Sequence, residues 1–139
     1  IDVAVRYLKG SYISRGNVKG CAYTPGGRPS LAMAAAGLLS LQVCGEHDSQ
    51  EAKGSAEWLS SQNVIGGGHF YYSTYYYSQA MQKQGQVMAK KAREIVEKAL
   101  LKKQQKNGSW NGSYGPVYCT SMAMLSLSVK YHYLPIYQD

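Results

Sequence analysis

Residues 104–116 read QQKNGSWNGSYGP, and this stretch decides the fold. Its two Gly-Ser pairs and its proline are typical of turns, yet Trp110 stands in the middle. A plain surface turn does not need a large aromatic side chain. We therefore expect Trp110 to fold back, to cap the apolar gap between neighbouring helices and to donate its indole N–H to an otherwise unpaired carbonyl.

The segments on either side of this turn differ in charge. Residues 86–105 carry an apolar stripe at helical spacing, with most of the lysines away from it, which predicts a one-faced outer helix. The stripe consists of Met88, Ala92, Ile95, Val96, Ala99 and Leu100. Pro116 suits the first turn of the next helix, which has no charge before Lys130. A helix without a charged face is predicted to be buried on most sides.

The same alternation of mixed and uncharged segments occurs twice upstream. Residues 3–8 and 49–61 predict outer helices, the uncharged runs 30–43 and 69–81 predict inner helices, and residues 21–27 predict a loop. The outer helices end at Tyr7-Leu8, Trp58-Leu59 and Leu100-Leu101, at roughly the 40–50-residue spacing of helical-pair repeats. Two five-residue segments of the uncharged runs also align, GLLSL at 37–41 with AMLSL at 123–127. We predict an all-α fold of helical hairpins in two curved layers, forming one domain over residues 1–139.

Residues 99–110, ALLKKQQKNGSW, match the QW motif in Gln105, Gly108 and Trp110. Residues 56–62, AEWLSSQ, match its first half in Trp58 and Gln62, but Gly-Gly-Gly-His-Phe replaces the following Gly-x-Trp. On these motifs the chain resembles the prenyltransferase and squalene-hopene cyclase (terpenoid cyclase-like) superfamily. Residues 23–42 and 115–138 also look like bacterial members that carry such repeats. The resemblance implies an α/α toroid, of which this chain supplies about half, so we expect it to be the C-terminal part of a longer protein.

The catalytic residues of that superfamily do not carry over. Its cyclases protonate a polyene with an Asp-x-Asp-Asp cluster, whereas the three aspartates here are scattered: Asp2, Asp48 and Asp139. Its protein prenyltransferases hold zinc with aspartate, cysteine and histidine. Cys21, His69 and Cys119 lie near the predicted starts of inner helices, but no Asp-x-Cys occurs. We predict no metal site and no cofactor, and the sequence leaves open whether the chain is an enzyme.

Tyrosine is the most unusual part of the composition, with 13 residues against one phenylalanine. Tyrosine buries an apolar ring and keeps a hydroxyl within reach of water or a ligand. In residues 69–81, Tyr72, Tyr75 and Tyr76 fall on one helical face, whereas Tyr71 and Tyr77 point elsewhere. Two interpretations stay open: packing between helices, or a concave pocket for a lipid, isoprenoid or sugar. The candidate ligand-binding residues are His69, Tyr71, Tyr72, Tyr75, Tyr76, Tyr114 and Tyr118.

His69 follows three glycines and precedes the tyrosines. A histidine and tyrosine pair is suited to general acid–base catalysis, although no carboxylate accompanies it in sequence, and capping of a turn is the alternative. The first candidate function is therefore binding of a ligand or partner on a tyrosine-rich concave face. The second is an enzyme acting on isoprenoid or glycan substrates, with acids supplied by missing or partner segments. The third is a structural assembly module.

Charge and hydropathy limit the partners. The net charge is +7, and residues 83–106 hold eight Lys and Arg against Glu94 and Glu97. Because no aromatic side chains are interleaved with them, we interpret them as a solvated helix face and not as a nucleic-acid surface. No apolar run reaches the roughly 18 residues of a membrane span. The expected partners are a hydrophobic small molecule, and a second copy or a missing N-terminal half that covers exposed inner helices.

Three shorter features have simple interpretations. Cys21, Cys44 and Cys119 are an odd number in separate segments, which disfavours a disulfide framework. Residues 44–49, CGEHDS, resemble a metal site, but Gly45 as a C-cap and Asp48 as the N-cap of a capping box with Glu51 explain them. The two Asn-Gly-Ser triplets at 107–109 and 111–113 fit turns.

Overall fold

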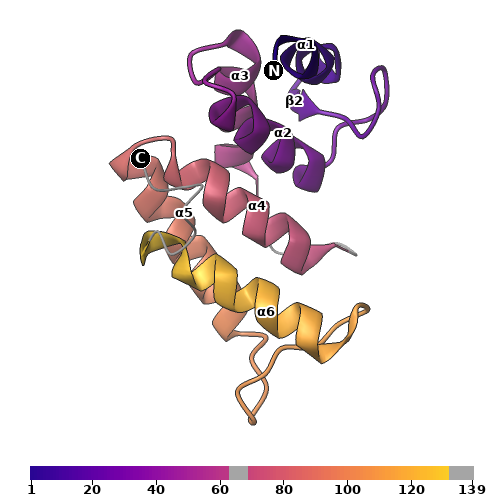
Figure 1. Cartoon of the computed structure of the whole chain (residues 1–139). Coiled ribbons are helices and arrows are strands. Elements are labelled where there is room, and N and C mark those ends of the chain that lie inside the picture. The colour runs from indigo at the N-terminus through magenta and orange to yellow at the C-terminus, as the bar shows by residue number, and fades with distance from the viewer. Residues whose placement is uncertain (63–68, 132–139) are drawn as a thin grey trace. The chain divides into compact units, whose positions relative to one another are not determined.

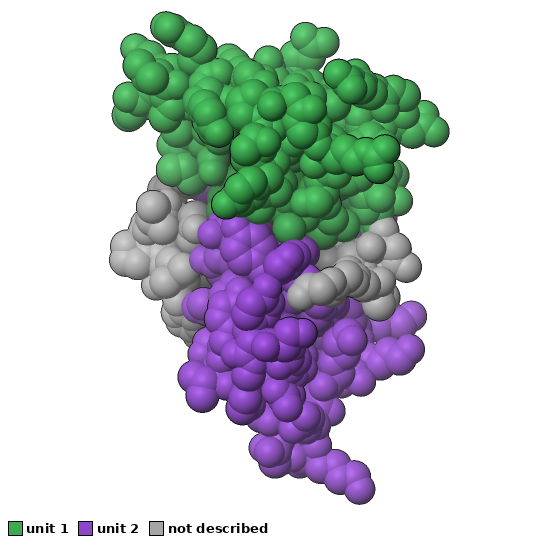
Figure 2. Space-filling model, turned by 90° about the vertical axis from the view of Figure 1, so that its right-hand side faces the viewer, with its two compact units in different colours: residues 1–63 green, residues 64–139 purple. Residues whose placement is uncertain are grey.

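The computed structural model of this chain describes residues 1–62 and 69–131. It divides into two compact units, unit 1 over residues 1–63 and unit 2 over residues 64–139 (Figure 2). The described residues are mostly helical, as predicted, but residues 12–21 contain two strands that an all-α fold does not include. That the whole chain forms one toroid-like domain stays a prediction.

Unit 1 holds the two strands and three helices: α1 (Asp2–Gly10), β1 (Tyr12–Arg15), β2 (Val18–Cys21), α2 (Leu31–Val43) and α3 (Gln50–Ser61). The strands pair antiparallel, with Tyr12 opposite Cys21 and Arg15 opposite Val18. Residues 16 and 17, Gly-Asn, form the two-residue connection, which is a hairpin signal in the sequence. Gly16 has a φ of 57°, in the left-handed region that such turns require.

The uncharged helix α2 is the core of unit 1. It begins one residue after Ser30, whose hydroxyl accepts a hydrogen bond from the Met33 N–H at 3.2 Å, so the predicted start near Pro29 is confirmed. It packs against β2 and α3. Gly37 allows the close approach of β2, because a Cβ there would overlap the Cys21 Sγ. An apolar helix with no charged face is thus buried, as expected.

The end of α2 follows the predicted capping. Gly45 has a φ of 83°, and its N–H donates to the Gln42 carbonyl at 3.0 Å. The next N–H, of Glu46, reaches back to the Leu41 carbonyl at 2.9 Å. These two bonds make a Schellman motif, which satisfies carbonyls that the helix itself leaves unpaired.

The predicted N-cap of α3 was wrong by one residue. Ser49, and not Asp48, caps the helix by accepting from the Ala52 N–H at 3.2 Å. The Asp48 carboxylate pairs with Lys53 at 3.1 Å instead. Glu51 then stands one position before the third helical residue, so the predicted capping box does not form.

Unit 2 is built from α4 (Phe70–Gln82), α5 (Gln86–Leu101) and α6 (Gly115–Ser128), followed by the 3₁₀ turn η1 (Val129–Tyr131). The tyrosine-rich α4 packs against both α5 and α6. Within this unit α4 and α6 run in the same direction (Figure 1). Helix α5 leads the chain from the end of α4 back towards the start of α6. The N-terminal ends of α4 and α6 therefore lie at the same end of unit 2.

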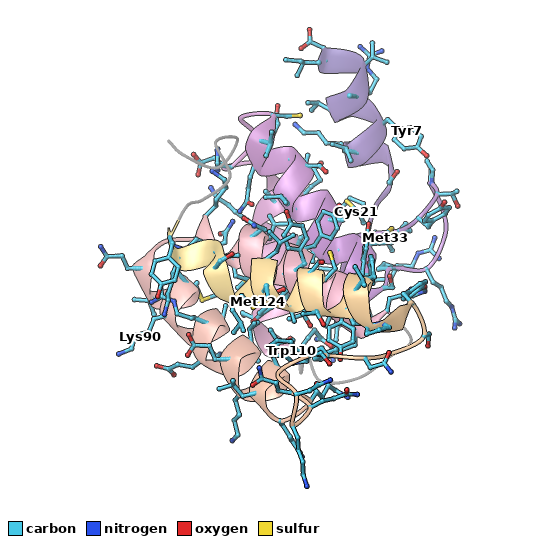
Figure 3. All side chains as sticks on the ribbon, turned by 60° about the horizontal axis from the view of Figure 1, so that its bottom comes forward. Tyr7, Cys21, Met33, Lys90, Trp110 and Met124 are labelled. Carbon is cyan, nitrogen blue, oxygen red and sulfur yellow. The ribbon has the colours of Figure 1, made fainter. Side chains whose placement is uncertain are left out.

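Helix α5 is one-faced, as predicted. Its buried residues are Ala89, Ala92, Val96, Ala99 and Leu100. Lysines such as Lys90 point to solvent, and Figure 3 labels Lys90 at the rim of α5. The basic residues within α5 thus lie mostly on its solvated face, whereas Lys83 precedes the helix and Lys102, Lys103 and Lys106 follow it. The helix ends at Leu101, so Gln104 and Gln105 belong to the following turn and not to the last helical turn.

Helix α6 differs from its prediction. It was expected to be buried on most sides, but its buried residues are only Cys119, Ala123 and Ser126. On its other flank Val117 is 80% exposed and Met124 is 55% exposed (Figure 3). The reason is that α4 and α5 pack on one flank of α6, and none of the described elements of unit 2 covers the other.

Trp110 folds back as expected and is 2% exposed. Its indole N–H donates to the Leu100 carbonyl at 2.8 Å, which ties the loop to the end of α5. One part of the prediction was wrong: this carbonyl is not otherwise unpaired, because the Lys103 N–H also donates to it at 2.9 Å. The backbone N–H of Trp110 donates to the Thr120 hydroxyl at 3.0 Å, which joins the loop to α6.

The remaining motif residues hold the turn that precedes Trp110. The Gln105 N–H donates to the Ser109 carbonyl at 2.8 Å, and the Gly108 N–H donates to the Gln105 carbonyl at 2.9 Å. In the first half-motif, Trp58 is only half-buried, and the Gln62 side-chain amide donates to the Trp58 carbonyl at 3.3 Å. Gln62 therefore caps the end of α3.

Candidate functional site

His69 and Tyr114 form a hydrogen-bonded pair at one end of unit 2. His69 immediately precedes α4 and Tyr114 immediately precedes α6. Because the two helices start at the same end, residues 45 positions apart in sequence meet: the His69 Nδ1 lies 2.8 Å from the Tyr114 hydroxyl. Their rings also stack, with centroids 6.0 Å apart. The imidazole tautomer decides which of the two donates.

A cavity of about 180 Å³ opens beside this pair. Four of the predicted ligand-binding residues line it: His69, Tyr71, Tyr72 and Tyr114. The other lining residues were not predicted from the sequence; they are Phe70, Lys103, Asn111, Gly112 and Ser113. The loop residues come from the second Asn-Gly-Ser triplet, which was interpreted only as a turn. The cavity therefore combines aromatic rings from α4 with polar groups from the loop before α6.

The loop is held on the ring of Tyr71. The Tyr71 hydroxyl donates to the Asn111 carbonyl at 3.0 Å, and the Gly112 N–H donates to the Asn111 side-chain oxygen at 2.8 Å. A Cβ at Gly112 would lie 3.2 Å from the Tyr71 ring and 3.3 Å from the Cys119 Sγ. Glycine thus lets the loop pack tightly here, and the rim of the cavity is fixed by α4.

Burial controls the protonation of two tyrosines near the cavity. Burial, followed by the proximity of Cys119, raises the pKa of Tyr71. Burial is also the main cause that raises the pKa of Tyr118, with smaller contributions from Tyr114, Cys119 and Tyr76. Both hydroxyls stay protonated at neutral pH, and that of Tyr71 donates to the Asn111 carbonyl.

Tyr75, Tyr76 and Tyr118 do not line the cavity, but their rings pack in two groups next to residues that do. The centroids of Tyr72 and Tyr76 are 4.6 Å apart, and those of Tyr75 and Tyr76 are 5.2 Å apart. Tyr114 and Tyr118 are also 5.2 Å apart. The predicted face of Tyr72, Tyr75 and Tyr76 is half-buried throughout, whereas Tyr71 and Tyr77 are buried in the core.

Unit 2 is basic, and one of its lysines, Lys103, lines the cavity. The described residues of unit 2 hold nine Lys and Arg against Glu94 and Glu97, and neither glutamate lines the cavity. The Lys103 ammonium lies 5.0 Å from the centre of the Phe70 ring, a cation–π distance. The N-terminal ends of α4 and α6 add partial positive charge, because backbone N–H groups point out of a helix there.

The cysteines and the acidic loop do not form a metal centre in the part of the chain that the structure describes, where no three His, Cys, Asp or Glu side chains come together. Cys21 lies in unit 1, with its thiol near the Leu8 carbonyl at 3.7 Å, and Cys119 is fully buried in unit 2. In the CGEHDS segment, Glu46 pairs with Lys9 at 2.7 Å. None of the described helices is long and apolar enough to span a membrane.

Protein-family models, curated proteins and solved structures were all compared with this chain, and none matches it. The function of the site therefore has to be inferred from its own geometry.

Proposed function

We propose that unit 2 is a ligand-binding module that holds one ring of a small organic molecule in the cavity beside His69 and Tyr114. The observation that carries this proposal is the cavity itself: aromatic rings from α4 face a polar loop across about 180 Å³. Most binding sites combine such apolar walls with a few placed polar groups.

The volume decides how much of a ligand fits. A cavity of roughly 150 Å³ holds benzene, whereas drug-sized ligands need about 300–1,000 Å³. The cavity near Tyr72 therefore suits a single six-membered ring, aromatic or sugar, with the rest of a larger ligand outside. A long isoprenoid chain is a poorer fit than the resemblance to terpenoid cyclases implies.

The proposal is tested by NMR titration of the whole chain with two neutral ring compounds, benzyl alcohol and methyl glucoside. The amide resonances of Gly112 and Ser113 report on the cavity rim. We expect at least one compound to shift them saturably, with a dissociation constant of about 1 mM, as is reasonable for so small a ligand.

Variants show whether the cavity is responsible. Tyr72→Ala removes a wall of the cavity and should weaken binding at least severalfold. Tyr23→Ala is the matched control, because Tyr23 is exposed and lies in unit 1. If both variants bind as the unmodified chain does, the ligand sits elsewhere and the proposal is wrong.

A second candidate is an enzyme that acts on a glycan ring, and the His69–Tyr114 hydrogen bond favours it. A histidine and a tyrosine in contact can pass a proton between a substrate and solvent. No carboxylate of the described residues lines the cavity, so catalytic acids would come from a partner or a further segment. Turnover of a polysaccharide that is lost in His69→Gln and in Tyr114→Phe, with folding intact, would establish this candidate.

We further propose that the chain belongs to an α/α-toroid array related to the QW-repeat superfamily and that it self-associates. The proposal is supported by the parallel α4 and α6, which pack on each other and are joined in sequence by the one-faced α5, as in helical-pair repeats (Figure 1). The exposed Val117 and Met124 leave an apolar flank on α6. A stacked array needs this kind of surface for its next helical pair, whereas a terminal repeat carries a polar one.

A further inference from the structure

We propose that the ligand of this cavity is an anion, namely a six-membered ring that bears a carboxylate, and that Lys103 and His69 recognise the carboxylate. The inference rests on the proposed function and names its ligand class. Two sources share this chemistry, an aromatic acid and a sugar acid, and the experiment below separates them.

Lys103 is the charged residue of the cavity wall. Its ammonium lies over the Phe70 ring, 5.0 Å from the ring centre, which places it beside the aromatic wall. Among the described residues it forms no ion pair with a carboxylate. A lysine that lines a cavity without a protein carboxylate is available to an anionic ligand.

His69 supplies a second donor. When the Tyr114 hydroxyl donates to Nδ1, the neutral imidazole carries its proton on Nε2. That N–H has no partner among the described residues. In that tautomer His69 offers a donor to a carboxylate, and Tyr114 is a positioning residue for its imidazole.

The rest of the cavity does not favour a cationic ligand. Its lining contains no Asp or Glu, and the nine basic residues of the described part of unit 2 raise the local concentration of anions. The aromatic walls of Phe70, Tyr71 and Tyr72 then account for the ring. A cation or a purely apolar chain would use the aromatic walls but not the positive charge.

The experiment measures dissociation constants by NMR on the whole chain at pH 7 for matched pairs of probes. The pairs are benzoate with benzyl alcohol and glucuronate with methyl glucoside, and acetate is the acid without a ring. We expect one acid to bind about tenfold more tightly than its neutral partner, and acetate to bind more weakly than either acid. Which acid prevails identifies the source of the ligand.

Two charge variants separate site recognition from general attraction. Lys103→Gln should weaken binding of the preferred acid about tenfold and leave its neutral partner unchanged. Lys90→Gln removes the same charge at the far end of α5 and should change nothing beyond about twofold. Rescue by Lys103→Arg, which keeps the charge, is expected to be nearly complete.

Other outcomes overturn the inference in distinguishable ways. Equal affinity for an acid and its neutral partner removes the anion preference but leaves the ring-binding proposal intact. Equal loss in Lys103→Gln and Lys90→Gln shows unspecific attraction to a basic surface. Binding of neither acids nor neutral rings removes both proposals. If a nucleic acid shifts the resonances of the lysines along α5 but not that of Gly112, the positive charge serves a different partner.

Discussion

Replacing Trp110 with alanine tests how the loop is attached to the helices of unit 2. The side chain is 2% exposed and bonds the Leu100 carbonyl, so the truncation removes both buried area and a hydrogen bond. Loss of a buried tryptophan costs about 3–5 kcal/mol of folding free energy. Of this, the hydrogen bond contributes about 1 kcal/mol. The Lys103 N–H still satisfies the Leu100 carbonyl, so Trp110→Phe should cost only about 1–2 kcal/mol.

The assay is equilibrium urea unfolding followed by far-UV circular dichroism. Trp58→Ala is the matched control, because Trp58 is half-buried in unit 1 and should cost less than Trp110→Ala. In Trp110→Ala the fluorescence of Trp58 reports unit 1 separately. A midpoint for Trp110→Ala equal to that of the unmodified chain refutes the packing role. A phenylalanine variant as unstable as the alanine variant shows that the hydrogen bond, and not the ring, holds the loop.

Three further changes have defined outcomes. Gly37→Ala places a methyl group on Cys21 and should cost about 1–3 kcal/mol in urea unfolding; an unchanged midpoint contradicts the close packing of β2 on α2. Burial raises the pKa of the Cys21 thiol to about 11, so the folded state holds this proton more tightly than the unfolded state. The corresponding stability is complete below the unfolded pKa, 9.0, and is lost as the pH rises towards 11, by about 2–3 kcal/mol. Thermal unfolding of the chain and of Cys21→Ala between pH 8 and 11 measures the difference, and parallel curves contradict it. Met124→Glu places a charge on the exposed flank of α6 and should shift the sedimentation coefficient of an associated chain to that of a monomer; a monomeric unmodified chain at high concentration contradicts self-association.

The helices could be predicted because their physical signals are local. Runs without charge identified α2, α4 and α6, and a stripe at helical spacing identified α5. The hairpin was missed because its strands are only four residues long, and residues 9–20, which contain the Gly-Asn turn, were assigned to no element. The burial of α6 was overestimated because apolarity shows that a face can be covered, and not which neighbour is present to cover it.

The candidate site was predictable only in part. The tyrosines stood out by composition, and their helical face followed from residue spacing. Pairing of His69 with Tyr114 depends on the parallel arrangement of α4 and α6, which no local pattern shows. Lys103 was interpreted as one more residue of a solvated face, because its position beside Phe70 arises only when the chain turns after α5.

The cavity between α4 and the loop before α6 is proposed to hold a ring. Intermolecular nuclear Overhauser effects between the ring protons of bound benzoate and the protein measure this directly. We expect contacts to the ring protons of Tyr72 and Tyr114, and their loss in Tyr72→Ala. Contacts only to exposed tyrosines such as Tyr23, or the absence of any contact at saturating benzoate, would contradict it.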